Sequence, residues 1–410
     1  MSKQTELNRF TCASRRTCPL PQQRHWARAG WQGCWRQLVR YCCGLGRGYL
    51  ILVLFLTTWT LYGCDNPAPP VNKPAATPPP LAAELVLYNI EDDLPMEVLD
   101  DFTREFGVKV DYQTYEDQET AVDNLRAGQV YDVVVLENRL VASLVDGGLL
   151  AELDHANIPN LKNIAANFRD LAYDPGNRFS IPYNWGTSGL VVRSDLAAEP
   201  VTRWADLWDP RYAGRVGLWM RQRRDVLGLA LKSLGYSANS ENPVELEAAL
   251  QRLLVLKPHI LILENFDPDS SAEVMASGKA VLSLGYAKDV LAGRKKNPAI
   301  TYVFPAEGTM LWGDNFVIPA ASTRKRTAEA LINYLQRPDV NAKIANLNTY
   351  ATANESALPL IDPAIRNDPV VFPSNQAMAD AELQAPLSPE GEKLYADIWE
   401  RLVSDPAKGN

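Results

Sequence analysis

Beyond residue 64 the chain has no cysteine and very little histidine. All six cysteines lie in the first 64 residues, so the rest of the chain can form no disulfide and offers no thiol nucleophile. Only His155 and His259 follow, which is too little material for a histidine-based metal site or a Ser-His-Asp triad. We interpret both histidines as structural and expect no metal.

Catalytic motifs are missing as well. The sequence contains no nucleophile elbow, glycine-rich phosphate loop or metal motif, so we expect neither a cofactor nor an enzyme. Acidic pairs are plentiful, and a carboxylate-pair hydrolase is the alternative among enzyme classes. The composition, 46% hydrophobic and 22% charged, is that of a globular protein with one large or two ordinary domains.

Beyond residue 64, positively charged residues are fewer than negatively charged ones. Residues 1–64 carry nine Lys or Arg and one acidic residue, which leaves 32 basic and 48 acidic residues in the remainder. The remainder therefore has a net charge of −16, against −8 for the whole chain. An acidic body disfavours nucleic acid as a partner and suits cationic ligands.

The long apolar run Tyr49–Leu61 stands near the start, after Arg40 and Arg47. A basic flank and an apolar run of this length predict a signal peptide rather than a transmembrane helix. The residues that follow, Leu61-Tyr62-Gly63-Cys64, resemble a bacterial lipobox, in which Cys64 is lipidated and anchors the protein to a membrane. Because Tyr62 is bulkier than that pattern favours, cleavage by an ordinary signal peptidase or retention as an anchor stays open.

The 48 residues before this run are long for the basic segment of a signal peptide, so we expect translation to begin near Leu38 or Val39. We therefore assign residues 1–64 to a signal segment. Residues 65–83 are rich in Pro and Ala and include Pro78–Pro80. We interpret them as an extended linker that holds a folded body away from a membrane surface.

Strand-like and helix-like patterns alternate from residue 84 onward. Apolar or alternating runs predict strands at 84–90, 108–115, 132–136, 216–219, 260–263, 280–284 and 300–304. Helical patterns lie at 95–106, 119–127, 140–146, 225–234, 244–256, 271–278, 289–295, 325–336, 340–347 and 389–403. This alternation indicates βαβ units and an α/β fold. The extended, glycine-punctuated segment Arg178–Ser194 interrupts it and is typical of a crossing between two lobes.

The segment Met310–Pro319 is a candidate site. If it is extended, Trp312 and Asp314 point to the same face, because they are two residues apart. An aromatic face beside a carboxylate can hold a cation. The alternative is a core tryptophan followed by a strand-end aspartate.

Many short motifs in order resemble the polyamine-binding branch of the bacterial extracellular solute-binding proteins, family 1, which are the spermidine/putrescine-binding proteins of ABC importers. They include Tyr88-Asn89, Thr114-Tyr115-Glu116, Tyr131–Val134, Ile181–Gly186, Trp204–Trp208, Leu234–Ser237 and Leu331–Val340. The resemblance spans about Glu84 to Leu402. It implies a two-lobed periplasmic-binding-protein fold, in which each lobe is a mixed sheet flanked by helices and extended hinge crossovers join the lobes.

The resemblance also implies a division of the chain and a role. Lobe 1 would combine residues 84–189 with 313–360, and lobe 2 would combine 190–312 with 361–410. A monomeric periplasmic receptor would capture a polyamine such as spermidine or putrescine in the cleft between the lobes. It would then deliver this ligand to an ABC permease in the inner membrane.

Positions that match the family supply the expected ligand contacts. They are Trp312 and Asp314, which would sandwich and grip an amine, together with Gln384, Asp92 and Asp225. Tyr183 and Trp185, on the crossing, are either cleft walls or core residues, and Tyr286 would replace a missing tryptophan. For Asp92 and Asp225 the alternative is a carboxylate at a helix N-terminus.

Departures from the family pattern bear on specificity. Ile90 stands where an aromatic residue is expected, Arg139 replaces part of an aromatic pair, Gln222 replaces an aspartate, and Lys288 follows Tyr286 closely. A like charge 4–6 Å from a bound ammonium costs on the order of 3–4 kcal/mol at a dielectric constant near 20. If Arg139 or Lys288 reaches the cleft, a shorter amine, a zwitterion or a ligand with its own carboxylate is favoured over a full-length polyamine. The further alternatives are an amino-acid-like or anionic solute bound by the same fold, and a degenerate receptor that acts as a sensor.

Overall fold

The computed structural model describes residues 80–91, 93–263 and 268–405. Every described residue lies in the second of the two units into which the chain divides, Thr77–Asn410. The predicted signal segment, Cys64 and Asp92 therefore lie outside the described residues. In the part of the chain that the structure describes, no helix is both long enough and apolar enough to cross a membrane.

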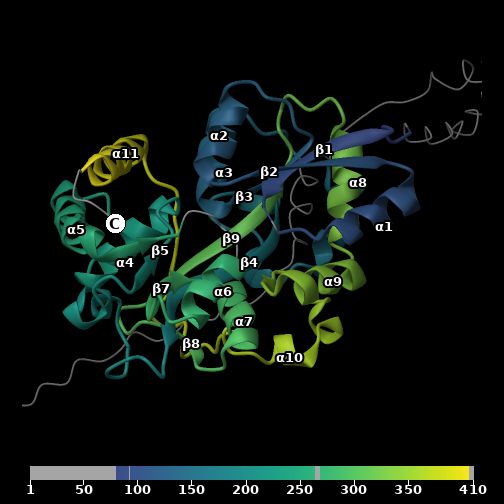
Figure 1. Cartoon of the computed structure of the whole chain (residues 1–410). Helices are drawn as coiled ribbons and strands as arrows, with labels where there is room; N and C mark the ends of the chain where they lie inside the picture. The colour runs from purple at the N-terminus through teal and green to yellow at the C-terminus, as the bar shows by residue number, and fades with distance from the viewer. Residues whose placement is uncertain (1–79, 92, 264–267, 406–410) are drawn as a thin grey trace, which may run out of the picture. The chain divides into compact units, whose positions relative to one another are not determined.

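A mixed β-sheet forms the centre of the second unit (Figure 1). Its strands are β1 (Glu84–Ile90), β2 (Lys109–Tyr115), β3 (Val133–Glu137), β4 (Ser180–Arg193), β5 (Val216–Leu218), β6 (Ile260–Ile262), β7 (Leu282–Gly285), β8 (Ile300–Val303), β9 (Met310–Val317), β10 (Ala351–Thr352) and β11 (Glu382–Leu383). The order is β2-β1-β3-β9-β4-β7-β5-β6, with β8 and β10 on β4 and β11 on β9. Strands β1–β3 are parallel to one another, as are β5–β7, whereas β4 and β9 pair with each other in antiparallel fashion.

Helices cover both faces of the sheet. They are α1 (Met96–Phe106), α2 (Gln118–Arg126), α3 (Asn138–Asp146), α4 (Arg223–Ser233), α5 (Pro243–Leu256), α6 (Pro268–Ala276), α7 (Ala287–Lys296), α8 (Lys325–Leu335), α9 (Pro338–Asn348), α10 (Pro363–Arg366) and α11 (Pro389–Ser404). Helices α1 and α8 lie on one face of β1–β3, and α2 and α3 lie on the other (Figure 1). Helices α4, α5 and α11 pack around a separate apolar core beside β5–β7.

Local sequence signals explain the helix ends. Helix α1 stops at Gly107, which adopts the left-handed conformation (φ 67°) that glycine tolerates best. Helix α5 starts after Asn242, whose side chain accepts the Val244 N–H, and Pro243 occupies the first helical position. Ser388 caps α11 in the same way.

The predicted α/β class is confirmed, and the predicted strands and helices occur with small shifts at their ends. The helix predicted at 271–278, for example, is α6 at Pro268–Ala276. Strands β10 and β11, helix α10 and the short 3-10 helices between His155 and Asn177 were not predicted. They are too short for hydrophobic periodicity to register, so tertiary pairing defines them.

Strands β4 and β9 run through both halves of the sheet. The first part of β4 pairs with β9 from Ser180–Val317 to Ser188–Met310, and its last part, Gly189–Val192, pairs with β7. The pairing has a register shift between Pro182 and Trp185. The extended crossing and the strand predicted at Met310–Pro319 are therefore adjacent strands.

Gly186 lies opposite Trp312 in this pairing. A Cβ atom added at Gly186 would overlap the six-membered ring of Trp312, so only glycine leaves room for the indole. At the neighbouring Gly313, an added Cβ would meet no atom closer than the Asn184 carbonyl oxygen at 3.7 Å. Two glycines in adjacent strands thus differ sharply in the space around them.

We predict that Gly186→Ala displaces the Trp312 indole and lowers the free energy of unfolding by about 1–3 kcal/mol, the usual cost of overpacking. Urea unfolding measures the free energy, and tryptophan emission reports the new indole environment. Gly313→Ala is the matched control and should stay close to wild type. Equal effects of the two substitutions would contradict the close packing of the Trp312 indole on Gly186.

Candidate functional site

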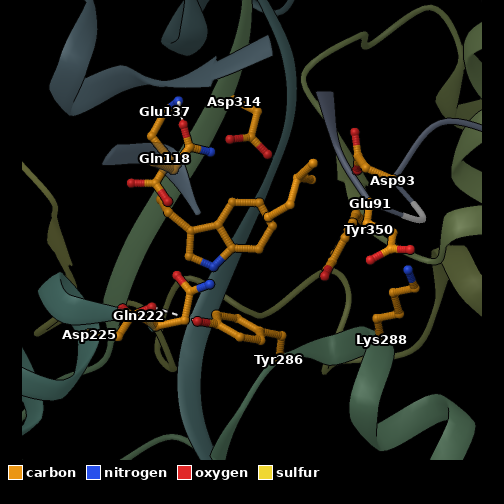
Figure 2. Close-up of a pocket in the computed structure, with 12 residues that line it drawn as sticks. Glu91, Asp93, Gln118, Glu137, Gln222, Asp225, Tyr286, Lys288, Asp314 and Tyr350 are labelled. Carbon is orange, nitrogen blue, oxygen red and sulfur yellow. Dashed lines mark hydrogen bonds between the residues drawn. The ribbon is translucent and has the colours of Figure 1, made fainter. Parts of the chain in front are cut away.

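Described residues from many parts of the chain line one pocket, with an empty volume of about 470 Å³ that includes its mouth. They are Ile90, Glu91, Asp93, Gln118, Glu137, Gln222, Asp225, Tyr286, Lys288, Trp312, Asp314 and Tyr350 (Figure 2). Five of these residues carry carboxyl groups and one is a lysine. The lining is therefore strongly acidic.

Most of these residues follow the carboxyl ends of parallel strands. Glu91 and Asp93 follow β1, Gln118 begins α2 after β2, Glu137 ends β3, Gln222 and Asp225 follow β5, and Tyr286 and Lys288 follow β7. Ligands of open α/β sheets bind in the crevice at these strand ends. The pocket therefore lies where parallel strands from both halves of the sheet terminate, and β9 adds Trp312 and Asp314.

Aromatic rings hold Trp312 in place at the pocket wall. Its indole is 8% exposed and packs edge-to-face against Tyr350, with ring centroids 5.1 Å apart, and against Tyr286, at 6.0 Å. These edge-to-face contacts and the close packing of the indole on Gly186 fix the ring plane. The indole is thus preorganised as a flat wall.

Asp314 is a buried carboxylate that lacks a donor. Its side chain is 7% exposed and accepts no hydrogen bond from any residue that the structure describes. Burial, and then the charges of Asp93 and Glu137, raise the pKa of Asp314 well above its usual range. A bound cation would remove this electrostatic penalty.

Asp93 lies in the same acidic region. The side-chain amides of Asn89 and Asn184 donate to it at 3.0 and 2.9 Å. Burial raises the pKa of Asp93, although these amides and the charge of Lys288 act in the opposite direction. Lys288 therefore acts on the acidic region from the pocket wall, as the sequence suggested it could.

Asp225 is saturated by neutral donors instead. Ser188 Oγ and Gln384 Nε2 donate to one carboxylate oxygen at 2.8 and 2.7 Å, and the Tyr286 hydroxyl donates to the other at 2.6 Å. Burial raises its pKa to about 6, against the effect of the Tyr286 hydrogen bond. Gln384 does not line the pocket; its side-chain amide donates to Asp225 and so positions that carboxylate.

Arg139 does not line the pocket either. Its guanidinium group, 5% exposed, pairs with Glu137 at 2.5 Å and with Glu119 at 3.2 Å, and Glu119 also pairs with Arg223 at 3.0 Å. Desolvation disfavours the charged form, but Glu137 and Glu119 outweigh it and raise the pKa of Arg139. Its positive charge is thus matched within an ion chain that joins α2 and α3 to α4.

Two predicted cleft residues lie elsewhere. The Tyr183 side chain is 1% exposed and packs against Phe316 in the core beneath α1 and α8. Trp185 stacks near Phe168, and its indole N–H donates to the Thr352 carbonyl at 3.2 Å. Neither side chain lines the pocket, so we leave both out of the candidate site.

Other predicted residues are brought together. Trp312, Asp314, Asp225, Tyr286, Gln222 and Lys288 all line the pocket, while Gln384 and Arg139 stand one layer behind it. Their roles toward a ligand stay predictions. Sequence reasoning missed Glu91, Asp93, Gln118, Glu137 and Tyr350 as polar or aromatic pocket residues. A signal was available for the first four, because each stands just after or at the end of a predicted parallel strand.

Comparison with known proteins identifies the family. Residues 97–373 match the family described as bacterial extracellular solute-binding protein. The chain belongs to this family. The spermidine/putrescine-binding periplasmic protein of Escherichia coli K12 is 34% identical over 322 residues, which are 78% of this chain and 91% of that protein.

Solved structures of solute-binding proteins share the fold. A putative spermidine/putrescine ABC transporter protein from Listeria monocytogenes is 28% identical, with a TM-score of 0.75, and the match covers 79% of this chain and 99% of that chain. The Tp0655 lipoprotein of Treponema pallidum is 25% identical, with a TM-score of 0.68, over 78% and 99% of the two chains. The two-lobed periplasmic-binding-protein fold that the sequence predicted is thereby confirmed.

The burial of Asp225 predicts a pH dependence for this solute-binding protein. Its pKa of about 6, above the usual 3.8, means that the native state holds the proton more tightly than the unfolded chain does. The resulting stabilisation is complete below about pH 4 and is lost as the pH rises to about 6. Asp225→Asn keeps the shape without the charge, so its free energy of unfolding relative to wild type should rise by about 2–2.5 kcal/mol between pH 4 and pH 7.

Urea unfolding in half-unit pH steps measures this difference. Asp209→Asn is the control, because a hydrogen bond from Arg211 lowers the pKa of the partly exposed Asp209 carboxyl. Its stability relative to wild type should move in the opposite direction as the pH rises. A difference for Asp225→Asn that does not change with pH would rule out the raised pKa.

Proposed function

We propose that this solute-binding protein is the receptor of an ABC importer and captures a small cationic solute, a polyamine such as spermidine or putrescine or a close relative. The buried Asp314 carboxylate carries the proposal, because no described residue donates to it while Asp93 and Glu137 add negative charge nearby. Such a carboxylate is costly unless a cation binds beside it. The names of the relatives support the same ligand class.

The walls of the pocket support a polyamine chemically. A polyamine is a rod of methylene groups with ammonium groups at intervals, so it needs carboxylates at its charges and flat apolar walls along its stem. Asp314 stands next to Trp312 on the same face of β9, and Tyr350 and Tyr286 extend the aromatic surface. Glu91, which is exposed, adds a negative charge to the lining.

The remaining assignments follow from the same role. We propose binding without catalysis, a monomer, and delivery of the ligand to an inner-membrane permease. The lobes would comprise 84–189 with 313–360 and 190–312 with 361–410, and they would close over the pocket by hinge bending. Cys64 would carry the lipid anchor on the periplasmic side, and the Treponema pallidum lipoprotein supports this arrangement.

Lys288 favours a second candidate ligand. It lines the pocket, and its charge opposes the rise that burial causes in the pKa of Asp93, so it places positive charge at a site for a cation. A zwitterionic solute, with an ammonium group at Asp314 and a carboxylate on the side of this positive charge, is therefore the second candidate. The same binding panel separates this amino-acid-like ligand from a polyamine.

A thermal-shift panel tests the proposal. The purified full chain is mixed with spermidine, putrescine, basic amino acids, γ-aminobutyrate and small anions. A ligand at 100 times its dissociation constant adds about 2.7 kcal/mol to stability and gives a clear shift. A shift with the polyamines supports the proposal, and a shift only with γ-aminobutyrate or an anion contradicts it.

We predict that Asp314→Asn weakens polyamine binding by about tenfold to a hundredfold, because a charged hydrogen-bond acceptor is lost. Isothermal titration measures the affinity. Asp397→Asn, at an exposed position of α11, removes the same charge away from the pocket and should bind like wild type. Equal affinities of the two variants would show that Asp314 does not hold the amine.

A further inference from the structure

Gln118 presents a side-chain hydrogen-bond donor to the pocket. It is the first residue of α2, its side chain is 5% exposed, and its Oε1 accepts the backbone N–H of Glu137 at 3.2 Å. This bond fixes the orientation of the Gln118 amide. If Oε1 and Nε2 were exchanged, two donors, the Glu137 N–H and the side-chain NH₂, would face each other. Among the described residues, no acceptor receives a hydrogen bond from Nε2. Figure 2 shows this amide pointing into the pocket on the same side as Asp314.

The wall around Gln118 is held rigidly. The Glu137 carboxylate accepts from Arg139 Nε, and Arg139 also pairs with Glu119, the residue after Gln118. The start of α2 and the end of β3 are therefore linked through Gln118 and through Arg139. A donor fixed in this way cannot turn aside when a ligand binds, so it imposes a chemical requirement on the ligand.

A plain polyamine meets only part of that requirement. A protonated amine carries only donors, so it satisfies Asp314 but leaves the Gln118 N–H groups without an acceptor. A buried donor that loses water and gains no acceptor weakens binding. Gln222 adds a second primary amide to the lining, and its side chain makes no hydrogen bond with the described residues.

We propose that the pocket prefers, over a plain polyamine of the same length, an amine that also carries a hydrogen-bond-accepting oxygen. The ammonium group binds Asp314, and the ether, hydroxyl or carbonyl oxygen accepts from Gln118 Nε2. This inference rests on the proposed function and specifies the ligand class of the same pocket. Gln118 is then a specificity-determining residue.

A matched pair of diamines tests the inference. Cadaverine and bis(2-aminoethyl) ether have the same length and both carry two ammonium groups, but an ether oxygen replaces the central methylene in the second. Isothermal titration of the purified full chain with each diamine gives the ratio of affinities. We expect the ether to bind about five- to tenfold more tightly, the gain from one neutral hydrogen bond.

Two variants assign that preference to Gln118. Gln118→Glu keeps an oxygen for the Glu137 N–H but replaces the donor with a carboxylate oxygen, so the preference should reverse toward cadaverine. Gln118→Met removes the donor without adding charge, and the preference should disappear. Circular dichroism melts establish that each variant is folded at the titration temperature.

The outcomes separate the two proposals. If wild type binds cadaverine as tightly as the ether, or if Gln118→Glu keeps the wild-type preference, the inference about Gln118 is wrong while the cation-receptor function stands. If neither diamine binds and spermidine and putrescine also fail to bind, the proposed function fails and the inference fails with it.

Discussion

The antiparallel pairing of β4 and β9 is the constraint on which the other features depend. Both strands run through the two halves of the sheet, so they fix where the carboxyl ends of β1–β3 and of β5 and β7 lie. The same pairing sets Trp312 on Gly186 and turns Asp314 toward the pocket. A pocket at the junction of the two parallel halves of the sheet therefore has an aromatic wall whose central ring, Trp312, stands on a strand.

Burial of negative charge is the second constraint, and the molecule meets it in three different ways. The Glu137 carboxylate is paired with the Arg139 guanidinium group, which also pairs with Glu119. Asp225 is surrounded by three neutral donors and keeps a raised pKa. Asp314 has neither kind of partner among the described residues. Because only the third arrangement leaves a charge to be satisfied, the binding chemistry centres on Asp314.

Much of the fold was predictable, because hydrophobic periodicity and turn residues are local signals. The alternation of strands and helices, the long strand at Arg178–Ser194 and the strand at Met310–Pro319 all came from patterns of this kind. The site was predictable only in part. Trp312, Asp314, Asp225 and Tyr286 were expected at the pocket and line it, whereas Tyr183 and Trp185 belong to the core and to a side cluster. Alternation along β4 places residues on two faces, but it does not reveal which face meets the pocket.

The sequence by itself determined the α/β layering, the acidic character of the body and the pairing of an indole with a carboxylate on one strand face. Each of these properties follows from composition or from spacing over a few residues. Only the tertiary structure decided which carboxylate is left for a ligand. Gln384 reaches Asp225 from 159 residues away, and Arg139 on α3 meets Glu119 of the neighbouring helix α2. Ionisation and hydrogen bonding of buried groups depend on such neighbours in space, and no pattern along the chain encodes them locally.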